Sequence, residues 1–211
     1  MSIEQWLAFA AASAVMLAIP GPTILLVISY ALGHGRKTAL ATVTGVALGD
    51  LTAMTASILG VGALLAASAD AFTVLKWIGG AYLIFLGIRL WRAPVVDGPL
   101  ADNDNLPEQK SLRIMAHAYV VTALNPKSIV FFVAFLPQFI NQKAAFWPQV
   151  AIFEVTFVVL AALNALVYAL VADKARHLIR KRSVQKAVNR TGGTLLIAAG
   201  AVTAGYRRIA A

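Results

Sequence analysis

The sequence predicts an all-α membrane protein with six transmembrane helices, arranged as two inverted three-helix repeats in which helices 1 and 4 are broken at proline. Three observations support this fold class. Hydrophobic residues make up 60% of the 211 residues and charged residues only 13%, whereas soluble domains carry about 25% charged residues. The apolar residues form long uninterrupted runs. Motifs in the first half of the chain also recur in the second half.

Six apolar runs are candidates for the membrane spans. A helix needs about 20 apolar residues to cross the ~30 Å hydrocarbon core of a bilayer. In order, the runs are Trp6–Leu32, Ala39–Ala67, Phe72–Leu90, Ile114–Ile140, Phe146–Val171 and Gly192–Tyr206. The last run reaches only about 22 Å at 1.5 Å per residue, so it spans the core only if Ala187–Thr191 join the helix. Five spans are the alternative.

The first run is expected to be a permanent span rather than a cleaved signal. The chain starts with MSIEQWLAF, which carries Glu4 and has no positively charged residue. A secretory signal peptide begins with a positively charged region, which is missing here.

The basic residues indicate the orientation of the spans. The chain has 18 Lys and Arg residues against 9 Asp and Glu residues. Most of them lie in alternate loops: Arg36 and Lys37; Arg89, Arg92, Lys110 and Arg113; and Lys174, Arg176, Arg180, Lys181, Arg182, Lys186 and Arg190. Loops rich in Lys and Arg stay in the cytoplasm, so six spans place both termini outside. The positive charge then attracts anionic lipid at the cytoplasmic face, and we do not expect nucleic acid as a partner.

The first run is interrupted in its middle. The stretch LAIPGPTILLV places Pro20, Gly21 and Pro22 inside an otherwise apolar helix. An interior proline costs roughly 3 kcal/mol because it lacks an N–H group and clashes with the preceding turn. The two prolines release the carbonyl groups of Met16 and Ala18, which must find other partners inside a membrane. The sequence therefore predicts a broken helix.

The fourth run carries a matching interruption. The stretch LNPKSI places Asn125, Pro126 and Lys127 in mid-run, and Pro126 releases the carbonyl group of Thr122. Paired broken helices in transporters point to the substrate site. A break exposes carbonyls that can hold an ammonium group, and the following half-helix begins with N–H groups that can hold a carboxylate. A zwitterionic amino acid has both groups.

A glycine motif links the third run to the sixth. Gly79 and Gly80 open the stretch GGAYLIFLG, and Gly192 and Gly193 open the stretch GGTLLIAAG. If spans 1 to 3 and spans 4 to 6 are repeats, each repeat crosses the membrane an odd number of times, so the two halves insert with opposite orientation. We therefore predict a first repeat at residues 1–91, a cytoplasmic linker at 92–113 and a second repeat at 114–211.

Two charged residues lie near the middle of the membrane. Asp50 and Lys127 are each roughly 20 Å into their helices, at 1.5 Å per residue. Such charges cost about 2.5 to 3.5 kcal/mol each and are tolerated only beside a cavity or a partner. We expect Asp50 to receive a substrate ammonium or a coupling proton. Lys127 attracts a substrate carboxylate or pairs with Asp50, and the alternative is that the two form a purely structural ion pair.

Two polar residues of the fifth run are further candidates. Glu154 occupies the place in the second repeat that Asp50 occupies in the first, so it is either a coupling residue or an interfacial one. Asn164 either lines the pore or forms a hydrogen bond between helices.

Small residues predict close helix packing in the second run. They follow at intervals of four: Ala41, Gly45, Gly49, Ala53 and Ser57. Such a stripe lets helices approach closely in membranes, which would bring a broken helix near Asp50.

The sequence indicates neither a cofactor nor an enzyme. It contains no cysteine, and its 3 histidines are scattered, which argues against a metal site. No nucleophile and base combination or phosphate-binding glycine loop is found at a useful spacing.

At these motifs the chain resembles the lysine exporter superfamily, especially its branch of homoserine and threonine efflux proteins, the LysE or RhtB type. The matching stretches are PGP at 20–22, GVALGD at 45–50, KWIGGAYLIFLGIRLW at 76–91 and LNPKSIVFFVAFLPQF at 124–139. The resemblance implies a bacterial inner-membrane exporter of amino acids or related metabolites, driven by the proton gradient or the membrane potential.

Two other functions remain as alternatives at this stage. A non-transporting membrane scaffold would explain the packing stripe but not Asp50 or the broken helices. A cation exporter is disfavoured because only two acidic residues are available for its site. The sequence leaves open which amino acid is exported, which ion drives export and whether the chain forms a homo-oligomer.

Overall fold

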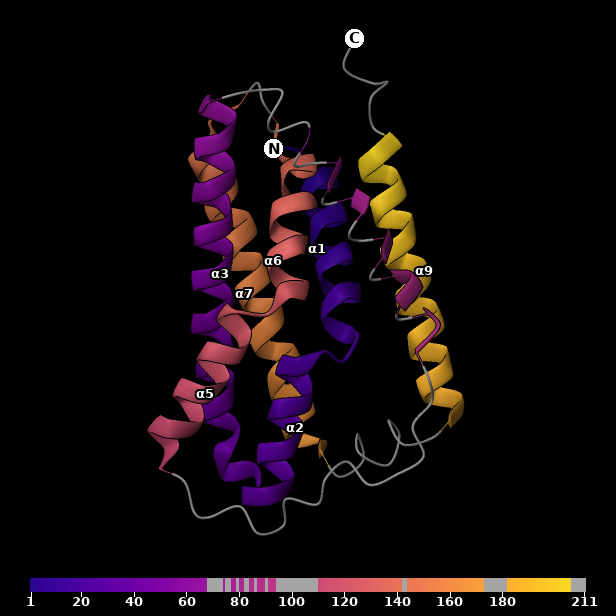
Figure 1. Cartoon of the computed structure of the whole chain (residues 1–211). Helices are drawn as coiled ribbons and strands as arrows, with labels where there is room; N and C mark the ends of the chain where they lie inside the picture. The colour runs from indigo at the N-terminus through magenta and orange to yellow at the C-terminus, as the bar shows by residue number, and fades with distance from the viewer. Residues whose placement is uncertain are drawn as a thin grey trace.

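The computed structural model describes residues 1–67, 110–141, 144–172 and 182–205, together with residues 74, 77–78, 80–81, 84–85, 87–89 and 91–93. Every regular element in these residues is a helix (Figure 1), which confirms the all-α class. Most of the predicted linker 92–113 and Gly79 lie outside the described residues.

The first apolar run forms two helices with a break between them. Helix α1 covers Ile3–Ala18 and starts with a capping box, in which the Ser2 and Gln5 side chains each accept a hydrogen bond from the other's backbone N–H. Helix α2 covers Pro22–His34, and the two helix axes differ by 54°. The break falls at Pro20 to Pro22 because a proline is tolerated in the first turn of a helix but not in its interior.

The second run forms one long helix. A short 3₁₀ turn, η1 (Arg36–Thr38), follows Gly35, whose φ of 77° is in the left-handed region that glycine tolerates. Helix α3 then covers Ala39–Ala67, with the same limits as the predicted run.

The fourth run is again two helices. Helix α5 covers Ser111–Ala123, and helix α6 covers Pro126–Ala134 and continues into the 3₁₀ turn η2 (Leu136–Phe139). The bend is 46°, and Asn125 caps the start of α6. Both breaks lie near mid-height of the bundle (Figure 1).

Two further helices complete the described structure. Helix α7 covers Phe146–Leu170 and helix α9 covers Arg182–Gly205. The sixth run is thus part of a helix of 24 residues that includes Ala187–Thr191. Within the described residues, two helices are long and apolar enough to cross a membrane, or four if each bent pair counts as one span. Helix α9 is not among them, so the six-span topology stays a prediction.

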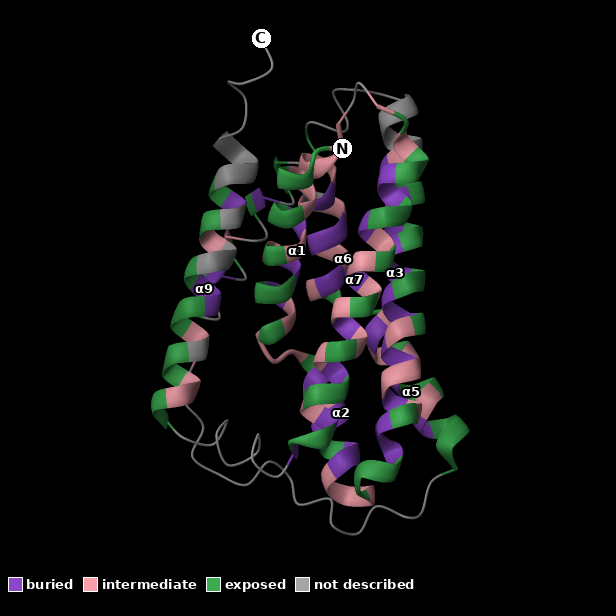
Figure 2. Ribbon diagram, turned by 180° about the vertical axis from the view of Figure 1, so that it is seen from behind, coloured by how far each residue is buried: buried purple, intermediate pink, exposed green. Residues whose placement is uncertain are grey.

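Between them, the two long helices pack against all four halves of the broken helices. Helix α3 packs against α5, α6 and α7, while α7 also packs against α1 and α2. The core between them is rich in phenylalanine, including Phe9, Phe132, Phe153 and Phe157, each 0 or 1% exposed. Exposed positions follow the outward sides of these ribbons (Figure 2). Many of them are large apolar residues, such as Leu48, Val155 and Val159, as expected for surfaces that face lipid.

Helices α3 and α5 meet at two glycines. A Cβ atom on Gly45 would lie 2.4 Å from the Met115 carbonyl oxygen, and one on Gly49 would lie 2.7 Å from the Thr122 Cβ. Both distances are shorter than real Cβ contacts, so only glycine allows this close approach. The approach brings the start of the second break next to Asp50, the residue that follows Gly49.

Glycines also join α9 to the described residues of the third run. A Cβ on Gly87 would meet the Gly193 carbonyl oxygen at 2.6 Å, and one on Gly200 would meet the Gly80 carbonyl oxygen at 2.5 Å. The repeat motif aligns Gly80 with Gly193 and Gly87 with Gly200. If each glycine is replaced by its counterpart in the other motif, the contact of Gly87 with Gly193 becomes the contact of Gly200 with Gly80. Gly192 is buried in α9.

Candidate functional site

The site lies where the two broken helices meet, and its first feature is the C-terminal end of α1. The break leaves the last carbonyl groups of α1 without helical partners. The Lys127 ammonium, which comes from α6, donates hydrogen bonds of 2.8 Å to the Met16 carbonyl and 2.7 Å to the Ile19 carbonyl. A cation is favoured at this position because the helix dipole places partial negative charge at the C-terminal end.

Helix α7 supplies hydrogen-bond donors for the carbonyls of Leu17 and Ala18, which lie between those of Met16 and Ile19. Asn164 Nδ2 donates to the Leu17 carbonyl at 3.1 Å, and the Tyr168 hydroxyl donates to the Ala18 carbonyl at 3.1 Å. Side chains from α6 and α7 therefore satisfy the four carbonyls at the end of α1. Because these bonds cross between elements, the break ties the second half of the chain to the first.

The second break is linked to the first through Thr23. Its Oγ1 accepts hydrogen bonds from the Thr122 hydroxyl at 3.3 Å and from Asn125 Nδ2 at 3.2 Å. The Asn125 Oδ1 in turn accepts from the backbone N–H of Lys127 at 3.1 Å. The Thr122 carbonyl, which Pro126 releases, accepts from the Asn125 N–H at 3.0 Å. These buried groups fix the N-terminal end of α6 against that of α2.

Asp50 is the buried acid of the site. Its side chain is 2% exposed, and its Oδ1 atom has no hydrogen-bond partner among the described residues. The Ser128 hydroxyl is the polar group that faces it. Within the described residues, no ion pair joins Asp50 to Lys127, because the Lys127 ammonium is bound to the α1 carbonyls instead. A buried carboxylate oxygen without a partner is costly.

A small cavity connects these groups. Its volume is about 20 Å³, which is enough for about one water molecule. The polar and glycine residues that line it are Gly21, Thr23, Asp50, Asn125, Lys127, Ser128 and Asn164. The cavity is too small for a solute of the size of an amino acid.

Glu154 lies outside this cavity. Its Oε1 accepts a hydrogen bond from the Thr55 hydroxyl of α3 where α3 meets α7, and Thr55 is exposed while Glu154 is half-buried. Thr55 is five residues beyond Asp50, which corresponds to about 7.5 Å along the helix. A role for Glu154 in coupling stays a prediction.

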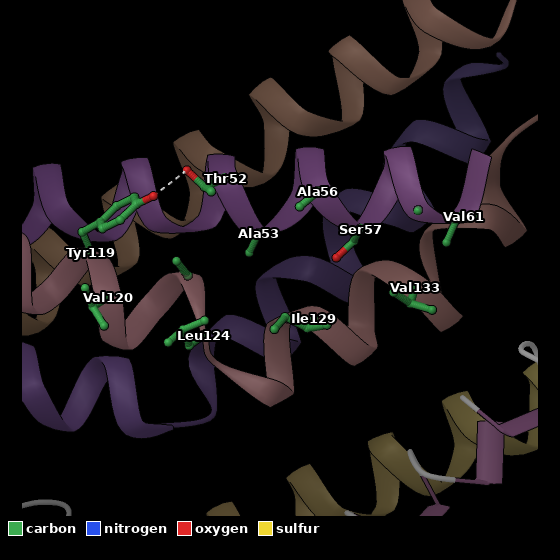
Figure 3. A pocket seen from close by; sticks show the side chains of 12 residues that line it. Thr52, Ala53, Ala56, Ser57, Val61, Tyr119, Val120, Leu124, Ile129 and Val133 are labelled. Atoms are coloured by element: carbon green, nitrogen blue, oxygen red, sulfur yellow. Dashed lines mark hydrogen bonds between the residues drawn. The ribbon is translucent and has the colours of Figure 1, made fainter. Parts of the chain in front are cut away.

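A larger hollow is found on the outer side of the α3 and α5 contact. This groove has a volume of about 720 Å³ and lies between α3, α5 and α6 (Figure 3). Its lining is mainly apolar, with Ala56, Leu124 and Ile129 among the lining residues. At its edge the Tyr119 hydroxyl donates to Thr52 Oγ1 at 3.4 Å. Among the residues that the structure describes, none that lines the groove is charged, so none of them would select a charged or zwitterionic solute.

Comparisons with known proteins identify the family of the chain. The family model of the LysE type translocators matches residues 14–206. The chain belongs to this family. The translocator is therefore a membrane transporter and not an enzyme, and the predicted family is confirmed.

Several relatives of the translocator have names. A homoserine/homoserine lactone efflux protein of Salmonella typhi is 33% identical over 98% of this chain and 99% of that protein. An uncharacterized membrane protein of Vibrio cholerae is 33% identical over 97% of this chain and 98% of that protein. A leucine efflux protein of Enterobacter sp. (strain 638) is 32% identical over 60% of this chain and 59% of that protein. No solved structure matches the chain.

The structure adds residues that the sequence did not single out as part of the site. Ser128 and Thr23 line the cavity, and they are at equivalent positions after the two proline breaks. Tyr168 is one helical turn beyond Asn164 and binds the neighbouring carbonyl. A search for polar residues spaced by four in α7, or aligned between the repeats, would have found them.

Proposed function

We propose that the translocator is a secondary-active exporter of amino acids or closely related small metabolites, coupled to protons through Asp50. One observation carries this proposal: two broken helices meet at a small cavity that is lined by one carboxylate and one ammonium group. Broken helices at mid-membrane with such groups are typical of substrate sites in transporters. The named relatives, which are efflux proteins for homoserine, homoserine lactone and leucine, support the same substrate class.

The cavity offers partners for both ends of an amino acid. The Asp50 carboxylate and the carbonyls at the end of α1 are suited to an α-ammonium group. The start of α2, which has no side-chain cap, and the third N–H of the Lys127 ammonium are suited to an α-carboxylate. The net charge of Asp50 and Lys127 is zero, as is that of a zwitterion, so binding one leaves the buried site neutral.

The packing supports alternating access by two inverted repeats. In the two repeats, α1 corresponds to α5, α2 to α6 and α3 to α7. The contact of α3 with α5 therefore corresponds to that of α7 with α1, and both contacts are present. The contact of α3 with α6 likewise corresponds to that of α7 with α2. The two glycine contacts between α9 and the third run also correspond to each other in this way. Rocking one repeat against the other would open the cavity to one side of the membrane at a time.

The charge distribution supports an orientation with the basic end in the cytoplasm of a bacterial inner membrane. The turn η1 and the starts of α5 and α9, where basic residues cluster, lie at one end of the bundle (Figure 1). Anionic lipid would be attracted to this face. Cysteines introduced at Gly35 and Ser183 should be protected from an impermeant maleimide in intact cells, while a tag after Ala211 should be accessible. A tag found only in the cytoplasm would contradict the six-span orientation.

Coupling requires that protonation differ between the two faces. Binding a substrate alone shifts an equilibrium but cannot drive net export. We propose that Asp50 takes up a proton from the outside and releases it to the inside, and that substrate binds from the inside when Asp50 is charged. Membership in a transporter family argues against the scaffold alternative.

The test is transport by the purified protein in liposomes. The vesicles contain an equimolar mixture of the twenty amino acids, and mass spectrometry records what leaves under an imposed pH gradient. We expect a few amino acids to leave faster than from protein-free vesicles, and faster when the receiving side is acidic. Identical loss from vesicles with and without protein would contradict the proposal.

A further inference from the structure

The position of Lys127 points to a feature beyond the general transport scheme. Buried opposite charges normally pair, because an unpaired buried charge is expensive. Here the Lys127 ammonium is bound to the Met16 and Ile19 carbonyls at 2.8 and 2.7 Å, although the buried Asp50 lines the same cavity. The Asp50 Oδ1 atom meanwhile has no hydrogen-bond partner in the part of the chain that the structure describes. The end of α1 is therefore a good ammonium site in its own right.

The chemistry of this site matches a primary ammonium group. An ammonium ion has three N–H donors and no acceptor, and the site offers carbonyl oxygens at the negative end of a helix dipole. The two neighbouring carbonyls, those of Leu17 and Ala18, are already bound by α7. The site thus has room for one ammonium group, and the Lys127 side chain fills it.

We propose that the Lys127 ammonium is a tethered stand-in for the substrate: it occupies the site of the substrate α-ammonium in the empty closed transporter, and the substrate ammonium displaces it. This inference rests on the proposed function and assigns the ammonium half of the substrate site to the carbonyls of Met16 and Ile19. The displaced Lys127 then binds the substrate carboxylate. The tether keeps the empty cavity closed and neutral, which prevents a leak of small cations through the α1 break.

The proposal predicts that an empty carbonyl site will accept a free amine. In a Lys127→Ala variant the site has no ammonium, so ethylammonium should bind and stabilise the protein. At an amine concentration about five times its Kd, linkage predicts a Tm rise of about 2 to 4 °C for a chain of this length. Tetramethylammonium, which has no N–H donor, and ethanol, which has no charge, should not reproduce the shift.

Matched variants locate the binding site. The wild type should show no shift with ethylammonium, because the tethered group has a high effective concentration. Lys186→Ala removes an exposed lysine of α9 and should behave like the wild type. The double variant Lys127→Ala with Asp50→Asn should keep the shift if the carbonyls hold the amine. Loss of the shift in that double variant would mean that Asp50, not the carbonyl site, holds the amine and would overturn the proposal.

Competition separates a substrate site from a purely structural cap. In Lys127→Ala, the shifts caused by ethylammonium and by the amino-acid mixture should not add, because both ligands need the same carbonyls. Additive shifts would overturn the displacement step. If the wild type exports amino acids but ethylammonium never stabilises Lys127→Ala, this inference fails while the proposed function stands. If the amine shift is present but no amino acid is exported, the proposed function fails instead.

A second variant keeps the test decisive if Lys127→Ala does not fold. The chain contains no cysteine, so Lys127→Cys introduces a unique thiol. Its thiolate displaces bromide from 2-bromoethylamine, which forms a C–S bond and restores an ammonium side chain of lysine length. Alkylation by (2-bromoethyl)trimethylammonium gives a positive charge without N–H donors. We expect only the first product to regain the wild-type Tm, and equal recovery by both would overturn the proposal.

Discussion

The close approach of α3 and α5 gives a prediction whose size follows from the structure. In Gly49→Ala, the new Cβ would lie 2.7 Å from the Thr122 Cβ and 2.8 Å from the Tyr119 carbonyl oxygen. Ordinary contacts begin at 3.4 Å, so α5 must retreat by about 0.7 Å. The clash involves backbone atoms, which cannot move away alone. Overpacking of this kind costs about 1 to 3 kcal/mol.

A control within the same helix isolates this cost. Gly62 has no atom within 4 Å of its Cβ position. Gly62→Ala therefore adds only the gain in helix propensity, about 1 kcal/mol, and this gain is common to both variants. The difference between the free energies of unfolding of the two variants therefore equals the cost of the clash. At about 2 to 4 °C per kcal/mol, we expect the Tm of Gly49→Ala to lie about 2 to 12 °C below that of Gly62→Ala.

The assay is thermal unfolding in detergent, followed by the fluorescence of the 4 tryptophans. Export should fall in Gly49→Ala as well, because Thr122 donates a hydrogen bond to Thr23 in the site. Equal Tm values for the two variants would show that α3 and α5 are not packed as the structure has them.

Further substitutions test other contacts. Asn164→Leu leaves the Leu17 carbonyl without its partner, which costs about 1 to 3 kcal/mol, so the Tm should fall by several degrees. Tyr168→Phe should cost less in the same assay, because the Tyr168 hydroxyl bond lies nearer the surface, and a larger loss than in Asn164→Leu would contradict this ranking. Gly193→Ala and Gly200→Ala should destabilise to a similar extent, because each places a Cβ within 2.6 Å of a carbonyl oxygen. A loss of stability in only one of these two variants would argue that the two glycine contacts of α9 with the third run are not equivalent.

The sequence predicted the helices and their breaks well, because these depend on local chemistry. Apolar runs define the limits of α3, and the missing N–H groups of Pro20, Pro22 and Pro126 define where the broken helices restart. The spacing of Gly45 and Gly49 also indicated a close helix contact, which the structure has between α3 and α5.

The partners of the buried groups could not be predicted, because they depend on how distant helices meet. Depth in the membrane suggested that Asp50 and Lys127 face each other, but it gave no distance between them. The end of α1 lies beside α6, and the Lys127 ammonium donates hydrogen bonds to two of its carbonyls rather than pairing with Asp50. Similarly, the repeat aligned Glu154 with Asp50 but could not show that Thr55 is its neighbour.

The role of Asp50 as the coupling residue is the central claim, and one comparison tests it most directly. Asp50→Asn keeps the shape of the side chain but cannot exchange a proton. In liposomes that contain the exported amino acid, an imposed pH gradient should no longer drive net export by the variant, because its side chain stays uncharged on both faces of the membrane. Thr52→Val, on the outer groove, should retain pH-driven export. Net export by Asp50→Asn that still responds to the pH gradient as the wild type does would contradict the account.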